Sequence, residues 1–349
     1  GGAGIGTGLN CDVNEIAITK SNIIAKAPAD GEEGGAGIGS GRAGSVGTIK
    51  ITNCPSVEAV GGPHSAGIGC GGHHTLVTTI LTTKCGPIVL TANNPDYKVK
   101  AFGGNKAAGI GTGLGGKFKG KTKDGNSIVI DGYSVDASGG YGGAGIGGGA
   151  NGSGGRGADS NSILIKGKGV INANGGEGAA GIGGGNGGNI TKKGKINIQC
   201  KQDKPMEIVA RGGTNSAGIG GGKDQSSCEI VIKGHPRKRE LLKIRAFASS
   251  AGNRINDAAA IGSGQDDAGN ITIKDATVYA DAPYAGADIG SGSLKGRPGK
   301  IHSITIDNST IAARGSNKIA AGIGAGHGGS IDRIKISNST YKGNSIGTS

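Results

Sequence analysis

Four acidic residues in the last third of the chain form the only grouping that suggests carbohydrate chemistry. Asp266 and Asp267 are adjacent, and Asp281 and Asp288 follow shortly after them. A glycoside hydrolase needs two carboxyl groups about 5 to 9.5 Å apart on either side of a cleft. We expect no aromatic platform for a sugar ring beside these acids. We therefore interpret them as loop acids and predict no catalytic residue.

Histidines near the first third of the chain are the closest approach to a set of metal ligands. His73 and His74 are adjacent, and His64 and Cys70 lie nearby. Their spacing fits no zinc-binding pattern, and adjacent side chains of a strand point to opposite faces. Glycine runs such as Gly145–Gly149 suggest a phosphate loop, but that loop needs a helix after a strand, and no helical pattern is present. We predict neither a metal nor a cofactor.

The six cysteines are an even number, which is typical of an oxidising compartment. Cysteines in adjacent repeats can be linked only where their Cα atoms come within about 7 Å. Cys200 and Cys228 occupy different positions in their repeats and do not meet this condition. Cys70 and Cys85 flank the same insertion, so we predict a disulfide between them. The pairing of the others stays open: Cys11, Cys54, Cys200 and Cys228.

The chain is basic, with 38 Lys and Arg against 25 Asp and Glu and a formal net charge of +13. This balance favours anionic partners such as acidic glycans or an anionic cell surface. Basic groups occur at Lys117–Lys123 and Arg237–Arg239. We interpret them as a solvated rim without a specific nucleic-acid partner, because no aromatic residues alternate with them as in single-strand binders. No apolar run of about 18 residues predicts a membrane span.

A glycine-rich motif must position all of these residues, because it recurs along the whole chain. Its clearest copy is Gly143–Gly149, and its Ala-Gly-Ile-Gly kernel returns every 28 to 42 residues, with the second position altered in two copies. A period in this range indicates stacked supersecondary units. The ten kernels are centred on Ile5, Ile38, Ile68, Ile110, Ile146, Ile182, Ile219, Ile261, Ile289 and Ile323.

Two short alternating runs separate successive kernels. One example is Ile304–Ile306 and Thr310–Ala313, joined by the polar turn Asp307–Ser309. Alternating β-branched residues around such a turn predict strand, turn and strand. We predict an all-β, right-handed parallel β-helix of about ten coils with three short strands each. A β-propeller is disfavoured because its blades need four strands. Residues 1–349 should form a single solenoid domain with loop insertions near 70–86 and 234–243.

With this kernel and these runs, the chain resembles glycine-rich parallel β-helix surface proteins, including adhesin passengers and polymorphic outer-membrane-protein-like repeats. The resemblance implies an extracellular or cell-surface location and an adhesive or structural role. With no initiator Met or signal peptide in the sequence, we expect a mature chain or a fragment. Our first hypothesis is a structural protein, not an enzyme, that self-assembles head to tail into fibres or a coat. A glycan-binding adhesin is the alternative, and a polysaccharide lyase or hydrolase is a more distant one.

Two surfaces are expected to carry self-assembly. If the Ala and Ile of each kernel point inward, side-chain alternation turns the glycine between them outward. Unpaired strand edges at the two ends should also recruit each other. The outward glycines should form a flat stripe for lateral packing, at Gly37, Gly67, Gly109, Gly145, Gly181, Gly218 and Gly322. The residues expected at the ends are Ala3, Ile5, Ile334, Ile336 and Tyr341.

Overall fold

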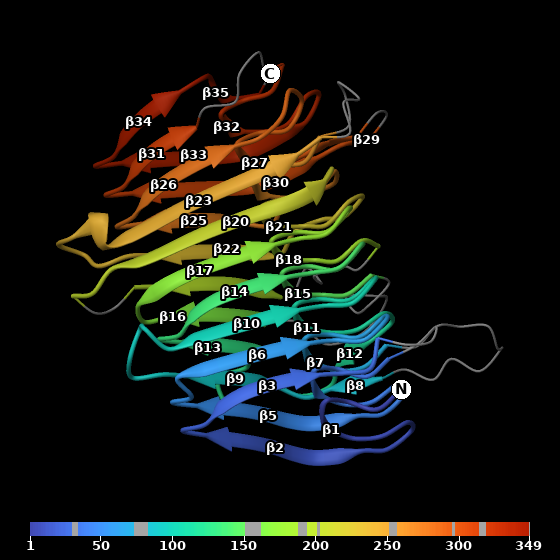
Figure 1. Ribbon diagram of the computed structural model, residues 1–349. Helices are drawn as coiled ribbons and strands as arrows, with labels where there is room; N and C mark the ends of the chain where they lie inside the picture. Colours follow the sequence, from blue (N-terminus) through green and yellow to red (C-terminus); the bar gives the residue numbers. More distant parts are fainter. Residues whose placement is uncertain are drawn as a thin grey trace.

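The computed structural model is a right-handed parallel β-helix built from three long sheets (Figure 1). Most coils contribute one strand to each sheet, with the short strands β8 and β12 added to the second sheet, and the strands pair in parallel with their counterparts in the neighbouring coils. The predicted fold class and the three-strand coil are therefore confirmed. The structure describes residues 1–29, 34–72, 83–150, 162–187, 194–200, 203–250, 257–294, 297–313 and 319–348.

The kernels make the first sheet. Each strand holds only an isoleucine and the following glycine, and successive isoleucines are in register, as Ile146 is with Ile182. The last strand, β35, was not expected, because Asn344 and Ser345 replace the usual Ala and Gly. The eleven strands are β1 (Ile5–Gly6), β4 (Ile38–Gly39), β7 (Ile68–Gly69), β11 (Ile110–Gly111), β15 (Ile146–Gly147), β18 (Ile182–Gly183), β21 (Ile219–Gly220), β24 (Ile261–Gly262), β27 (Ile289–Gly290), β32 (Ile323–Gly324) and β35 (Ile346–Gly347).

The Ile-x-Ile runs form the second sheet. In each strand two isoleucines or their equivalents point inward, and Ile163 is in register with Ile196. Its strands are β2 (Val13–Thr19), β5 (Val46–Thr52), β8 (Lys84–Cys85), β9 (Ile88–Thr91), β12 (Lys117–Phe118), β13 (Ile128–Asp131), β16 (Ser162–Lys166), β19 (Lys195–Gln199), β22 (Glu229–Lys233), β25 (Ile271–Lys274), β30 (Lys300–Asp307) and β33 (Ser330–Ser337).

The Val-x-Ala runs form the third sheet. Its inward residues also stack in register, as Val135 does with Ile171 and Ala137 with Ala173. Its strands are β3 (Asn22–Lys26), β6 (Ser56–Val60), β10 (Lys98–Phe102), β14 (Ser134–Ser138), β17 (Gly169–Asn174), β20 (Met206–Thr214), β23 (Leu242–Ser249), β26 (Thr277–Asp281), β31 (Thr310–Ala313) and β34 (Thr340–Gly343). A two-stranded antiparallel pair, β28 (Ser293–Leu294) and β29 (Arg297–Pro298), lies outside these sheets.

The interior is a thin aliphatic column. The kernel isoleucines from Ile38 to Ile323 are all fully buried, and isoleucines of the second sheet face them. Tyr133 is the largest fully buried side chain, and its hydroxyl oxygen accepts a hydrogen bond from the Cys54 N–H at 2.7 Å. Burial raises the pKa of this phenol. Aliphatic stacking between coils therefore supplies most of the apolar burial that stabilises the fold.

The expected exposed stripe of kernel glycines is wrong. All seven glycines assigned to that stripe are buried. A Cβ on Gly145 would lie 2.6 Å from the Asn174 nitrogen and 2.9 Å from the Ala137 oxygen, both in backbone of the third sheet. Because the kernel strand is only two residues long, the glycine sits at a corner where the third sheet passes close by. Glycine is required here because the backbones of two strands approach closely, and this buried position cannot form a lateral surface.

The second glycine of each kernel has a different requirement. Gly147 has a φ of +139°, and a Cβ there would lie 2.0 Å from the Gly183 oxygen. Its equivalents in the other coils, such as Gly39 and Gly290, also have positive φ. An L side chain rarely adopts this conformation, so glycine recurs there for backbone reasons.

Hydroxyl groups just after several kernels join the coils. The Thr7 hydroxyl oxygen accepts a hydrogen bond from the Gly41 N–H at 2.9 Å, and Thr112 does the same for the Gly149 N–H at 2.9 Å. Ser263 is equivalent and accepts from the Gly292 N–H at 2.8 Å. These short side chains satisfy backbone donors at the corner that the sheets leave unpaired.

The two predicted insertions differ in how much of them the structure describes. Residues 73–82, including His73 and His74, lie outside the described residues, and the described chain resumes at Thr83, just before β8. Residues near 234–243 form an antiparallel bridge between His235 and Lys238 and the 3-10 helix η1 (Arg239–Leu241) before β23 begins. Residues 49–52 are in register with Ile88–Thr91, and residues 206–211 are in register with residues 242–247, with a register shift after Arg211.

The terminal coils keep the strand pattern but leave part of their interior residues accessible. The five residues expected at the ends, Ala3, Ile5, Ile334, Ile336 and Tyr341, are all half-buried. Ile346, on β35, is 46% exposed. The Tyr341 hydroxyl donates to the Asn344 oxygen at 2.6 Å. Each terminal coil presents three parallel strands with one free edge.

Candidate functional site

The acidic residues singled out in the sequence are not brought together into one site. Asp266 accepts a hydrogen bond from the Ser226 hydroxyl at 3.2 Å, and Asp267 accepts one from the Lys300 N–H at 2.9 Å. Asp288 is fully buried and accepts from the Ala282 N–H at 2.8 Å. Asp281 lies on the outer face of the third sheet. These contacts fit the interpretation of most of them as structural acids.

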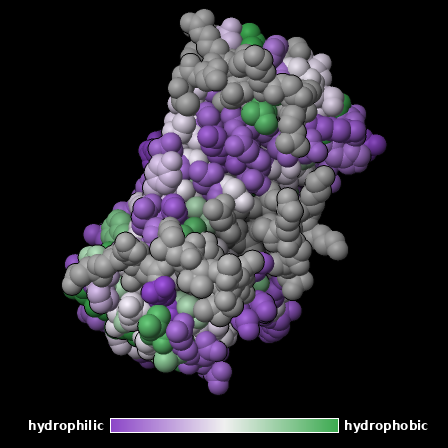
Figure 2. All heavy atoms as spheres, turned by 90° about the vertical axis from the view of Figure 1, so that its right-hand side faces the viewer, coloured by the Kyte–Doolittle hydropathy of each residue, from purple (hydrophilic) through white to green (hydrophobic). Residues whose placement is uncertain are grey.

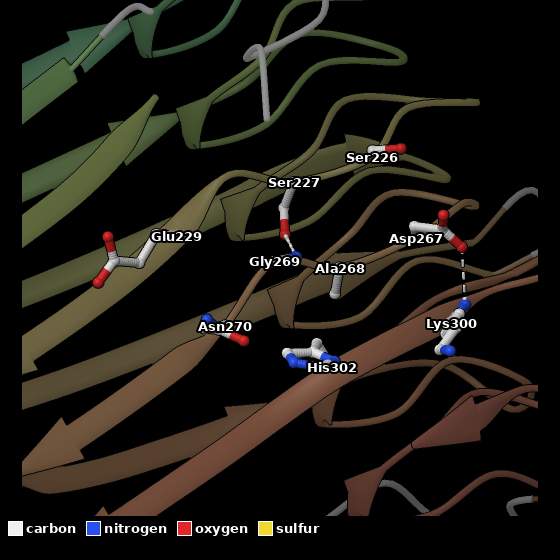
Figure 3. Close-up of a pocket in the computed structure, with 9 residues that line it drawn as sticks. All are labelled: Ser226, Ser227, Glu229, Asp267, Ala268, Gly269, Asn270, Lys300 and His302. Carbon is white, nitrogen blue, oxygen red and sulfur yellow. Dashed lines mark hydrogen bonds between the residues drawn. The ribbon is translucent and has the colours of Figure 1, made fainter. Parts of the chain in front are cut away.

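A polar pocket of about 400 Å³ crosses β22, β25 and β30 on the second sheet (Figure 3). Glu229 lies on one side of it, and Asp267 with Lys300 lies on the other. Its lining is Ser226, Ser227, Glu229, Asp267, Ala268, Gly269, Asn270, Lys300 and His302. The pocket therefore offers several hydrogen-bond donors and acceptors.

Most charged groups in the polar pocket already have partners in neighbouring coils. Glu229 pairs with Lys195 at 3.2 Å, and Asp332 accepts from the His302 Nδ1 at 2.7 Å and from the Lys300 Nζ at 3.3 Å. These hydrogen bonds, that of His302 foremost, hold the pKa of Asp332 below its usual value. No cluster of three or more metal-ligating side chains occurs within the described part of the chain. The pocket's charges serve mainly to join successive coils.

A second hollow, which we call the aromatic groove, lies on the outer face of the third sheet. It has a volume of about 550 Å³ and runs across β23, β26 and β31. The Phe247 and Tyr279 rings lie next to each other there, with centroids 5.6 Å apart and planes inclined by 48°. The groove is lined by Lys243, Ile244, Arg245, Phe247, Thr277, Val278, Tyr279, Thr310 and Ala312.

The hollow arises from a step in side-chain size between adjacent coils. Tyr279 on β26 is in register with Ala312 on β31. Side chains in register on neighbouring strands lie about 4.8 Å apart, so a small residue beside a large one leaves one flank of the large ring open. The groove is therefore bounded by the Tyr279 ring and has Ala312 on its floor.

Cationic groups surround the aromatic pair. The Arg211 guanidinium carbon lies 5.4 Å from the Phe247 ring centroid, which is a cation–π contact. Arg245 Nε pairs with Glu207 at 3.5 Å, and Lys243 lies at the same edge of the groove. The Tyr279 hydroxyl donates to Asp281 at 3.4 Å. Apolar ring faces, guanidinium groups and a carboxylate thus occur together on one surface.

The expectation that no aromatic platform lies beside these acids is wrong at Asp281. Tyr279 donates a hydrogen bond to Asp281, and the Phe247 ring, which belongs to the preceding coil, lies next to the Tyr279 ring. Sequence separation hides the pair, because Phe247 follows the inward Ala246 on β23 and Tyr279 precedes the inward Ala280 on β26. The signal available in the sequence was that both positions flank the inward alanine and so face outward.

Four segments match the family model described as "Beta helix repeat": residues 49–72, 128–150, 163–186 and 304–327. Each segment runs from a strand of the second sheet, through the third sheet, to the following kernel. A match to the family model therefore covers one coil at a time. The chain is a parallel β-helix repeat protein. Comparison with curated proteins and with solved structures gives no match.

This β-helix repeat protein also brings together the two cysteines assigned to a disulfide. Cys70 and Cys85 are fully buried free thiols that share a side-chain hydrogen bond. That bond lowers the pKa of Cys70, while burial raises the pKa of Cys85. Their disulfide stays a prediction. Cys54, Cys200 and Cys228 are buried as well, and burial raises the pKa of Cys228 to about 12.

The side of the molecule drawn in Figure 2 is mainly polar where its residues are described. Figure 2 shows that hydrophilic residues predominate in the described part of the side where the kernels lead into the second sheet, with hydrophobic residues scattered among them. No helix among the described residues has the length and apolar character needed to span a membrane.

Proposed function

We propose that this protein is an extracellular, non-catalytic binder of acidic glycans and that the aromatic groove is its binding site. One observation supports this above all others: the paired rings of Phe247 and Tyr279 on an outward face, flanked by Arg211. The chain has only three Phe and six Tyr, so an outward pair is a notable concentration of them. An aromatic face carries partial negative charge and attracts the C–H bonds of a sugar ring.

The charges beside the rings favour a sugar with a carboxylate. Arginine donates two parallel hydrogen bonds to a carboxylate, and a ring face orients the guanidinium for this contact. Arg211 is exposed and is oriented by Phe247, while Asp281 next to Tyr279 can accept bonds from sugar hydroxyl groups. A uronate unit presents both kinds of partner. We therefore propose a uronate-containing oligosaccharide as the ligand.

The direction of the groove also suits a polymer. The coils advance by about 4.8 Å per strand along the solenoid axis. This advance is close to the length of one sugar residue in a chain, so successive units can meet successive coils. An oligosaccharide that crosses β23, β26 and β31 would contact the rings with one unit and the threonines Thr277 and Thr310 with its neighbours.

Calorimetric titration with uronate-containing and neutral oligosaccharides tests the proposal. Tyr279→Ala should weaken binding of the uronate ligand about fivefold, which corresponds to about 1 kcal/mol for the lost ring contact. Phe102→Ala is the matched control, because Phe102 is an outward residue on β10 whose in-register neighbours are Val60 and Ser138. It should leave the affinity unchanged.

Three results would contradict the proposal. Equal losses in both variants would show that the groove is not the binding site. Equal affinity for neutral and uronate ligands would show that the arginines do not recognise a carboxylate of the ligand. Cleavage of the bound oligosaccharide, seen as new chain ends by mass spectrometry, would replace binding with lyase or hydrolase activity.

Head-to-tail assembly is the second candidate function, and the terminal coils favour it. Their free strand edges are parallel, and β35 of one chain can pair with β1 of another through Ile346 and Ile5, with one strand position left open in each of the other two sheets. Such a contact is heterologous and propagates as a fibre. The half-buried residues at both ends would gain burial on stacking. The partner in this case is a second copy of the chain.

Sedimentation velocity at increasing protein concentration tests the assembly. We expect growing species for the unmodified chain and a monomer for Ile346→Lys, because a buried lysine between two coils is unfavourable. Val170→Lys is the control, since Val170 is 43% exposed on β17 in the middle of the solenoid. A monomer at every concentration, or the same loss of assembly in the control, would refute end-to-end stacking.

A further inference from the structure

A cationic surface lies at β8 and β12, far along the solenoid from the aromatic groove (Figure 1). Five lysines form it: Lys84, Lys117, Lys119, Lys121 and Lys123. We call them the lysine ribbon. Lys117 is half-buried and the other four are exposed. Asp124 is the one acid in the segment from Lys117 to Asn126.

The backbone under the lysine ribbon is anchored. The Lys117 N–H donates to the Thr83 oxygen at 2.9 Å, and the Lys119 N–H donates to the Cys85 oxygen at 2.8 Å. Phe118 between them is 3% exposed and belongs to the core, so Lys117 and Lys119 point away from it. A turn from Thr122 to Asn126 closes the segment, with the Thr122 N–H bonded to the Asn126 oxygen at 2.8 Å. The lysines are therefore held by an ordered edge of the sheet.

The lysines at β8 and β12 lack the carboxylate partners that several other lysines of the second sheet have. Lys166 meets Asp131 at 3.0 Å, and Lys274, which is in register with Lys233, meets Asp307 of the next coil at 3.2 Å. At β8 and β12, Lys84 is directly in register with Lys117. Like charges directly opposite each other destabilise a strand pair. A repulsive arrangement on an anchored edge is explained if an anionic partner neutralises it.

Four of these lysines have no carboxylate partner in the described ranges: Lys84, Lys117, Lys119 and Lys123. Lys84 and Lys117 lie on neighbouring strands about 4.8 Å apart, and Lys117 and Lys119 are about 6.7 Å apart along one strand. The cations thus form a grid that can meet a row of anionic groups, and each contact releases counterions from the polymer.

We infer that the lysine ribbon is a docking surface for a linear sulfated glycan. A nucleic acid would also supply anions, but single-strand binders stack bases on exposed aromatic rings. Phe118, the one aromatic residue in the ribbon segment, is buried. The surface therefore offers charge without stacking, which suits a polymer whose anions project from sugar rings. This inference is independent of the proposed function, because the two surfaces involve different coils.

Binding of heparin oligosaccharides to the full chain as a function of NaCl concentration tests the inference. With four to five anions neutralised, we expect the logarithm of the association constant to fall with the logarithm of salt with a slope of about −3. Lys119→Gln with Lys123→Gln should reduce the slope to about −1.7 and weaken binding about tenfold at low salt. Both lysines are exposed, so the melting temperature should not change.

Lys166→Gln with Lys274→Gln is the matched control, because it removes the same charge from the same sheet at lysines paired with Asp131 and Asp307. It should change heparin affinity by less than about twofold, since screened charges far from a site contribute little. Equal losses in both double variants would mean that net charge alone attracts heparin. Equal binding of desulfated heparin, or of single-stranded oligothymidine with matched charge, would overturn the assignment to a sulfated glycan. Because heparin also contains uronate units that the aromatic groove would bind, the titrations are repeated in the Tyr279→Ala background, where the effect of the two lysine substitutions on the salt slope should persist; its loss in that background would place heparin in the groove and overturn the lysine ribbon.

Discussion

Replacing Gly147 by alanine is expected to destabilise the protein by about 4 kcal/mol or more, a larger loss than most single substitutions cause. The backbone at Gly147 has a φ of +139°, and the new Cβ would lie 2.0 Å from the Gly183 oxygen. That oxygen belongs to the backbone of the next coil, so no side-chain rotation relieves the overlap. The two coils must separate, which also breaks hydrogen bonds between them.

Urea unfolding followed by far-ultraviolet circular dichroism measures this effect. Gly8→Ala is the control, because no atom lies within 4 Å of a Cβ at Gly8. It should change the stability by no more than about 0.5 kcal/mol. An unchanged unfolding midpoint for Gly147→Ala would mean that the kernel glycines are not required by the backbone.

Replacing Ala312 by tryptophan is expected to abolish glycan binding, with a loss of affinity of at least about tenfold. Ala312 is half-buried and is the small residue in register with Tyr279. A large ring at this position occupies the hollow that a sugar would fill and covers the open flank of Tyr279. Tenfold corresponds to about 1.4 kcal/mol, which a blocked contact site readily exceeds.

Calorimetric titration with the uronate oligosaccharide again measures the loss, and thermal unfolding checks that the fold is kept. Ala17→Trp serves as the control, since Ala17 is an exposed residue on β2 in the second sheet. Undiminished binding by Ala312→Trp would place the ligand elsewhere on the molecule. Loss of binding by a variant that still folds would support the aromatic groove as the binding site.

Periodicity made most of the fold predictable. Each kernel isoleucine fills the same place in its coil, and the registers follow directly, as for Ile146 and Ile182. The alternation of Ile-x-Ile and Val-x-Ala then fixes which residues face inward, because a strand alternates strictly. The eleventh kernel at Ile346 was not predicted, since its preceding residues are Asn344 and Ser345.

The direction of the kernel glycines could not be predicted by the same rule. Alternation holds within a continuous strand, but each kernel strand has only two residues and lies at a corner. There the space around Gly145 is set by backbone of the third sheet, from residues Ala137 and Asn174. Close approach between backbones depends on how the coil closes, and a pattern of apolar residues carries no information about it.

The aromatic groove was hidden for a different reason. Its features come from differences between coils: Tyr279 and Ala312 share one outward place, and Phe247 occupies the next outward place, in register with Asp281. A search of the sequence for residues that recur in every coil does not detect positions at which the coils differ. Once the register is known, the outward residues can be compared coil by coil, and the hollow beside Tyr279 follows from side-chain size alone.

The kernels stay in register although the number of residues between them varies, and this has an evolutionary consequence. Kernels lie 23 to 42 residues apart, yet their isoleucines remain paired in register. Unequal recombination between two kernels would therefore add or delete one whole coil and keep every remaining strand in step. A change in the number of coil repeats within the gene is therefore enough to change the length of the solenoid and the distance between the aromatic groove and the lysine ribbon. The length of the molecule can thus change during evolution while the packing of its interior stays the same.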